Sequence, residues 1–219
     1  MPSVYLLMRA EVRMENLHGF LVSLVLLVTS GCTAMPAPIS STAQVDTTKG
    51  VLLAAISSDG NSQVRDTWFF YRQKGTSKEH RLDAFGLAGL LKKPNDFEGQ
   101  EAVMGRLIAL PLEPGQYELF NWTLYVTRFG GYGYISPKIP PPPHAFTIRA
   151  GEITYLGGLH VETVLGKNLT GMSLPFAGNP NITDQFTRDL PILKRKYPNL
   201  ADWTVQSSIP DNRQWRLSQ

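Results

Sequence analysis

The chain has 219 residues, of which 42% are hydrophobic and 18% are charged. This composition is typical of a folded globular protein and argues against intrinsic disorder. The formal net charge is only +3, and the densest basic run, 194–196, is typical of a solvated helix end. The sequence therefore does not predict nucleic-acid binding.

The N-terminal segment has the pattern of an export signal. Residues 19–28 read GFLVSLVLLV, with Ser23 as the one polar side chain. As a helix this run would span roughly 15 Å, about half of a bilayer core, which is too short for a transmembrane helix and typical of a signal peptide. A signal peptide usually begins with a basic segment, but arginines and glutamates are equal in number before this apolar run. The true start is therefore open between Met1, Met8 and Met14.

The chain's single cysteine, Cys32, follows this run directly, within the sequence Thr-Ser-Gly-Cys at 29–32. This sequence resembles the bacterial lipobox, although Thr stands where that motif usually has an aliphatic residue. The resemblance implies that 1–31 is a signal peptide and that Cys32 carries a lipid anchor. Thr33, rather than Asp, follows the cysteine, which implies the outer membrane of a Gram-negative envelope, facing the periplasm. The alternatives are a cleaved signal without a lipid and a buried helix.

The next segment, 32–50, is expected to be a lipidated, flexible tether. It consists of small, polar and proline residues without an apolar period, a composition typical of linkers. A lone cysteine also excludes an intramolecular disulfide, so the folded part must be stabilised by packing.

The body of the protein, 51–165, is expected to be a mainly β, antiparallel β-sandwich. Short apolar and aromatic runs alternate with turn residues throughout it, which is typical of strands. In the longest run, Phe120, Trp122, Leu124 and Val126 share one face and are expected in the core, with Tyr125 on the other face. The expected strands are 51–56, 66–72, 80–84, 104–112, 116–127, 145–149 and 153–164.

Two turn motifs in this body carry a resemblance. Pro114-Gly115-x-Tyr117 is followed by a run at 146–157 that contains Ala-Gly-Glu-Ile-x-Tyr-Leu-Gly. Together they resemble a group of uncharacterised bacterial lipoprotein domains with a prealbumin- or immunoglobulin-like sandwich. The resemblance covers 51–165 and implies the fold alone, because the group offers no catalytic residues to carry over.

Residues 128–144 read RFGGYGYISPKIPPPPH and are expected to form a long excursion between two strands. Four consecutive prolines favour polyproline II and cannot donate to a sheet ladder. Phe129, Tyr132 and Tyr134 could make this segment a partner-binding loop. Alternatively, the prolines protect a sheet edge from strand addition.

The C-terminal part, 166–219, is expected to be irregular apart from one helix over 183–197. Thr183 or Asp184 could cap a first turn, and Pro191 fits the first turn of a second helix start. Phe186, Leu190 and Leu193 share a face, so the helix is expected to pack on the sandwich.

No catalytic pattern is present in the sequence. His160 and Glu162 share a strand face, but two ligands are too few for a structural zinc site, and no serine-nucleophile elbow occurs. We therefore expect no catalytic residue, no metal and no cofactor. The sequence favours a lipid-anchored envelope protein with a non-enzymatic binding or structural role, whose partner would be the membrane and another envelope protein. The alternative is an envelope hydrolase whose site only the fold brings together.

Overall fold

The computed structural model describes residues 37–40, 44–86, 95–99, 103–128 and 130–216. They belong to one compact unit, Pro36–Gln219. Cys32 and Phe129 lie outside the described residues. Within the described part of the chain, no helix is long and apolar enough to cross a membrane.

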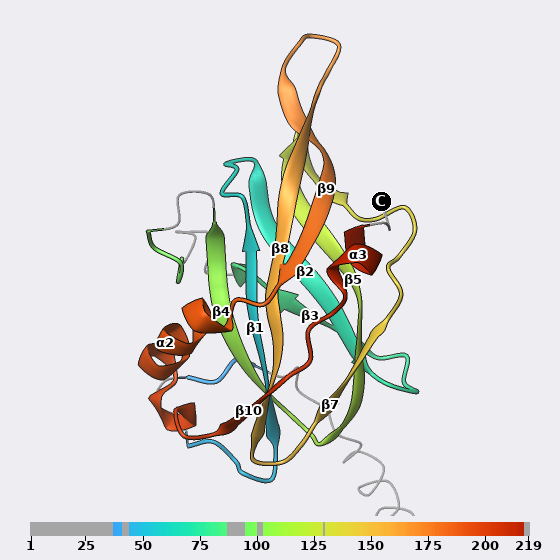
Figure 1. Ribbon diagram of the computed structural model, residues 1–219. Coiled ribbons are helices and arrows are strands. Elements are labelled where there is room, and N and C mark those ends of the chain that lie inside the picture. The colour runs from blue at the N-terminus through green and yellow to red at the C-terminus, as the bar shows by residue number, and fades with distance from the viewer. Residues whose placement is uncertain (1–36, 41–43, 87–94, 100–102, 129, 217–219) are drawn as a thin grey trace, which may run out of the picture. The chain divides into compact units, whose positions relative to one another are not determined.

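Two five-stranded sheets form a sandwich, as the sequence predicts (Figure 1). Sheet A contains β4 (Met104–Leu112), β1 (Gly50–Ser58), β8 (Glu152–Lys167), β10 (Thr204–Ser207) and β9 (Ser173–Thr183). Sheet B contains β3 (Glu79–Asp83), β2 (Val64–Gln73), β5 (Gly115–Arg128), β6 (Gly131–Ile135) and β7 (His144–Ile148). In each sheet one long strand, β8 or β5, pairs with two shorter strands along the same edge.

All seven expected strands are present, and three strands were not expected. β6 lies inside the segment 128–144, and β9 and β10 lie beyond residue 165, where we expected irregular chain. The sandwich therefore extends well past the predicted boundary at 165. The pairing is antiparallel except for β1 and β10, which both run parallel to β8.

Sheet A is buried on both faces, which produces two cores. The first core lies between the sheets and includes Trp122, Leu124 and Val126, as the sequence predicts. The second lies on the other face of sheet A, under helix α2 (Phe186–Lys196) and the short 3-10 helix η2 (Pro198–Leu200). Every residue of β1 is buried, because a strand covered on both faces has no solvent side.

Residues of the expected tether contact the second core. Ile39 and Val45 pack against it, and the backbone N–H of Ile39 donates to the carbonyl of Ala109 at 2.9 Å. The folded body therefore begins by Ile39 rather than at Val51.

Helix α2 is the helix expected over 183–197, and it is a single helix. The Asp184 carboxylate accepts from the N–H of Phe186 at 2.9 Å, at the first helical residue. Pro191 lies inside the helix, so the second start expected there was wrong. Phe186, Leu190 and Leu193 pack on the second core as predicted. A further short helix, α3 (Asn212–Arg216), buries Trp215 in the first core.

A β-bulge corrects the predicted orientation of Phe120. Phe70 pairs with Asn121 and Tyr71 pairs with Leu119, so Phe120 is an extra residue in β5. The bulge shifts the alternation by one residue. Leu119 is consequently buried, whereas Phe120 lies only half-buried beside Phe70, with ring centroids 6.4 Å apart.

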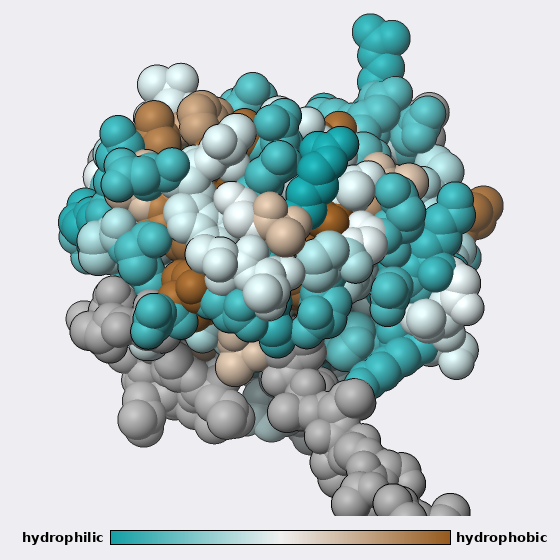
Figure 2. Space-filling view, turned by 90° about the horizontal axis from the view of Figure 1, so that it is seen from below, coloured by the Kyte–Doolittle hydropathy of each residue, from teal (hydrophilic) through white to brown (hydrophobic). Residues whose placement is uncertain are grey.

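The β8–β9 hairpin extends beyond the ends of the other strands (Figure 1). Because β8 runs parallel to β1, from Val51 beside Ile153 onward, the hairpin end is at the opposite end of sheet A from the start of β1. Figure 2 views the end at which β1 starts, where hydrophilic residues dominate and hydrophobic ones are scattered.

Candidate binding surface

The two expected binding residues that are described, Tyr132 and Tyr134, lie on strand β6 rather than in a loop. They are 64% and 62% exposed. β6 pairs antiparallel with the end of β5, so that Tyr134 is opposite Tyr125 and Tyr132 is opposite Thr127. Side chains alternate along a strand, so the buried Ile135 points inward and both tyrosines point outward.

These tyrosines belong to a cluster on the outer face of sheet B, which we call the aromatic face: Trp68, Tyr125, Tyr132 and Tyr134. The ring centroids of Trp68 and Tyr125 are 5.6 Å apart, and those of Tyr125 and Tyr134 are 5.2 Å apart, in both cases stacked. Tyr132 lies 5.4 Å from Tyr125. Three strands, β2, β5 and β6, thus hold four rings in contact. Such contacts contribute roughly 0.5–1.5 kcal/mol per pair beyond burial, so the rings are preorganised.

Arginines border the aromatic face on two sides. The Arg81 guanidinium lies 4.2 Å from the ring centroid of Trp68 and forms an ion pair with Asp83 at 2.7 Å. Arg65 lies 5.9 Å from the ring centroid of Tyr132, and its Nε donates to the Thr127 hydroxyl at 2.8 Å. No carboxylate among the described residues forms an ion pair with Arg65. This side of the face therefore presents an uncompensated positive charge.

The aromatic face also contains a buried polar group. The indole Nε1 of Trp68 is buried and makes no hydrogen bond with any described residue. Nearby, burial raises the pKa of Asp83, although Arg81 acts in the opposite direction.

A second group of side chains on the same face of sheet B has its positive charge paired with carboxylates. Arg72 lies over the ring of Phe120, 4.6 Å from its centroid, and forms ion pairs with Glu118 and Glu79. Because these charges are paired, this group offers less to a charged partner than the aromatic face does.

Sequence reasoning missed Trp68, Arg65 and Arg81 as parts of this surface. The expected strand 66–72 contains Trp68, but periodicity does not show which strand lies beside which. Tyr125 was correctly expected to face away from the core. The available signal was the alternation of Trp68 and Phe70 with the buried Phe69 and Tyr71, which places two rings on an outer face.

The described histidines and Glu162 each contact different partners. Nδ1 of His160 is 2.9 Å from the hydroxyl of Ser57, on the neighbouring strand. Glu162 accepts from the side-chain amide of Asn179 at 3.1 Å, rather than joining His160. His80 stacks on Tyr71, and His144 contacts Ser208. Among the described residues, no three His, Cys, Asp or Glu side chains could hold a metal ion.

Ser57 and His160 have the residue types of a nucleophile and its base, at the right separation. Ser57 is only 2% exposed, however, so its hydroxyl is not open to a substrate. Burial lowers the pKa of His160, and nearby Arg188 acts in the same direction, whereas Glu162 and Asp59 oppose it. A neutral imidazole that holds a buried hydroxyl is the simplest description of this pair.

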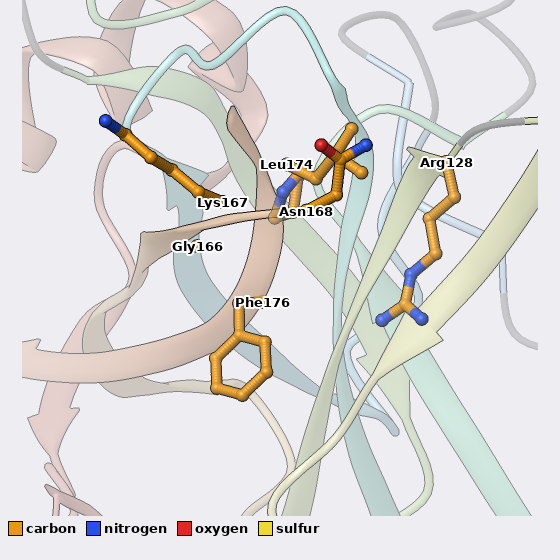
Figure 3. Close-up of a pocket in the computed structure, with 7 residues that line it drawn as sticks. Arg128, Gly166, Lys167, Asn168, Leu174 and Phe176 are labelled. Carbon is orange, nitrogen blue, oxygen red and sulfur yellow. The ribbon is translucent and has the colours of Figure 1, made fainter. Parts of the chain in front are cut away.

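Two hollows on the surface are small. One, of about 190 Å³, lies between Arg128 at the end of β5 and the β8–β9 hairpin, with Lys167 and Phe176 in its wall (Figure 3). The other, of about 290 Å³, lies between residues 95–98 and the Arg188 and Arg195 side of α2. Pockets for drug-sized ligands are usually about 300–1,000 Å³, so the exposed aromatic face is the stronger candidate.

Comparison with known proteins gives no assignment. No family model matches the sequence, and no curated protein matches it. Among solved structures, the chain is similar to part of a leucine-rich repeat protein from Bacteroides thetaiotaomicron, with 14% identity and a TM-score of 0.30. The match covers 69% of this chain and 16% of that one.

Proposed function

We propose that this protein is a lipid-anchored cell-envelope protein that binds a partner protein through the aromatic face of sheet B. The observation that carries the binding role is the stack of exposed rings: Tyr132 and Tyr134, each more than 60% exposed, lie against Tyr125 and Trp68. Trp, Tyr and Arg are the residues most enriched at the energetic centres of protein interfaces.

The preorganisation of the rings supports binding over a purely structural role. A strand-borne tyrosine that is already stacked loses little side-chain freedom on binding, and this loss is a main cost of association. The uncompensated Arg65 beside Tyr132 favours a partner surface that carries carboxylates, because complementary charge orients and accelerates association.

The anchor is proposed from the lipobox resemblance at Cys32 and from the export-signal pattern before it. The same resemblance supports the outer membrane and the periplasm as its location. One acyl chain gives only marginal membrane binding, so a lipidated Cys32 with several chains would hold the body firmly at the membrane.

The binding role is tested by crosslinking in the bacterium that produces the protein. A photoreactive amino acid at position 134 should form one or a few discrete adducts, whereas the same group at position 139 should not. Ile139 is the matched control because it is also exposed, at 68%, but lies outside the aromatic face. Changing Tyr132 to Ser and Arg65 to Ala should remove the adducts from position 134. Identical adducts from both positions would reject the proposal.

An envelope hydrolase is the alternative, and the Ser57–His160 hydrogen bond is the observation that favours it. This alternative requires the buried Ser57 to become accessible. Active-site labelling with a fluorophosphonate probe tests it directly, since a label on Ser57 that is lost in Ser57→Ala would establish a serine hydrolase.

A further inference from the structure

The end of the β8–β9 hairpin exposes an unusual number of apolar side chains. We define the hairpin tip as residues 163–178. Leu169, in the turn, is fully exposed, and Phe176 is 76% exposed. The other exposed apolar residues of the tip are Val164, Leu165 and Met172. Contiguous exposed apolar residues on a projecting element usually mark a contact site.

Hydrogen bonds within the turn satisfy several of its backbone groups, and one side chain supplies most of them. The Asn168 side-chain oxygen accepts from the N–H groups of Thr170 and Met172, at 3.0 and 2.9 Å, and from the Thr170 hydroxyl at 2.8 Å. Main-chain bonds between Asn168 and Met172 and between Asn168 and Gly171 close the turn. Moving a backbone N–H group from water into an apolar phase is costly when the group has no hydrogen-bond partner. A turn whose N–H groups are bonded internally therefore enters such a phase at a smaller free-energy cost.

The hairpin tip itself carries a single charged residue, which is positive. The sequence from 163 to 183 contains no Asp or Glu, and Lys167 is its one charged residue. Figure 3 shows Arg128 reaching from the end of β5 beside the hairpin. The carboxylates at the base are already bonded: Asp59 accepts from Thr163, and Glu162 accepts from Asn179.

We propose that the hairpin tip inserts into the surface of an anionic phospholipid membrane. The tip projects beyond the ends of the other strands (Figure 1), and the hollow that it lines together with Arg128 is small, at about 190 Å³. A projecting element without a large pocket suits a deformable apolar phase. Leu169 and Phe176 supply buried apolar area, while Lys167 and Arg128 are attracted to anionic headgroups.

This contact is distinct from the anchor proposed at Cys32, because it involves other residues. Ile39 contacts Ala109, which pairs with Leu53, and Leu53 pairs with Tyr155. At roughly 3.3 Å per residue along β8, the end of this strand at Lys167 lies roughly 40 Å further along the sheet.

Vesicle flotation tests the proposal with the compact body Pro36–Gln219, which holds both cores and lacks Cys32. The probes are vesicles of phosphatidylcholine alone and of equimolar phosphatidylcholine and phosphatidylglycerol. The body should float with the mixed vesicles and much less with the neutral ones. Leu169→Asp should lower the partition coefficient by at least about tenfold, the effect of losing one buried leucine side chain. Lys167→Glu should weaken binding to the mixed vesicles only.

Ile139→Asp is the matched control, since it places the same charge at another exposed apolar residue and should leave binding unchanged. Leu169→Trp adds a readout independent of affinity, because an inserted indole is quenched by brominated phosphatidylglycerol. Absence of binding to the mixed vesicles would overturn the proposal. Equal losses in Leu169→Asp and Ile139→Asp would overturn it as well.

Discussion

The hydroxyl of Tyr155 donates a hydrogen bond of 2.6 Å to the carboxylate of Asp189, and this bond joins β8 to helix α2. Asp189 is completely buried, and Arg188 Nε donates to its other oxygen at 2.7 Å. The pKa of Tyr155 is raised by burial first and by Asp189 second. The second core is thus held by a polar group as well as by apolar packing.

Removing this hydrogen bond should destabilise the body. Tyr155→Phe should lower the free energy of unfolding by about 1.5–3 kcal/mol, the usual contribution of a hydrogen bond to a charged group. Asp189→Ala should cost more, because it leaves the Arg188 charge without its buried partner. Urea unfolding measures both. Lys194→Ala, on the exposed side of the same helix, is the control and should change little.

Stability should fall as the pH is lowered through the titration range of His160. Burial holds its pKa below 6.5 in the folded protein, so the unfolded chain takes up a proton at a pH where the folded chain does not. The contribution of His160 to the free energy of unfolding is therefore complete above pH 6.5. It is lost as the pH falls toward the pKa that His160 has in the folded protein. Urea midpoints from about pH 8 to about pH 5 should decrease. His160→Gln should show a weaker decrease, because the pKa values of His144 and His80 are also lowered by burial and both residues contribute in the same direction.

The position of β9 over the core is tested at Gly178. A Cβ at this residue would lie 2.7 Å from the ring of Trp122. Gly178→Ala should therefore destabilise by about 1–3 kcal/mol through overpacking. Gly131→Ala provides the comparison, since a Cβ there meets nothing within 4 Å. If the two variants unfold at the same urea concentration, β9 does not pack on Trp122.

The bulge in β5 predicts opposite results for two adjacent residues. Leu119→Ala should cost about 2–5 kcal/mol, the usual loss for a buried leucine. Phe120→Ala should cost far less, since its ring is on the outer face with Phe70 and Arg72. If β5 alternated regularly through Phe120, urea unfolding would show the larger loss of stability for Phe120→Ala and the smaller one for Leu119→Ala.

The anchor is tested by mass spectrometry of the N-terminus of the mature protein. Cys32 should be the first residue and should carry the mass of a diacylglycerol and an amide-linked acyl chain. Cys32→Ser should abolish this lipid mass. An unmodified Cys32, or cleavage at another residue, would contradict the lipobox resemblance.

Much of the sandwich could be predicted because its strands alternate apolar and polar residues, or are apolar throughout, as in β1. β9 could not, since Pro175, Gly178 and Pro180 are typical of loops. Such residues are tolerated there because β9 lies at the edge of sheet A. β6 was missed because its glycines hide the strand pattern. The aromatic face needed the order of β2, β5 and β6, which no local pattern contains.

The parallel pairing of β1 with β8 also has a consequence for the order of folding. Val51 on β1 pairs with Ile153 on β8, which lies about a hundred residues later in the chain. Contacts at such separation form slowly, because a long loop must close before they stabilise anything. If the chain is exported from its N-terminus, its most apolar strand emerges first and is completed late. Factors that shield β1 until β8 has emerged would therefore limit aggregation during assembly.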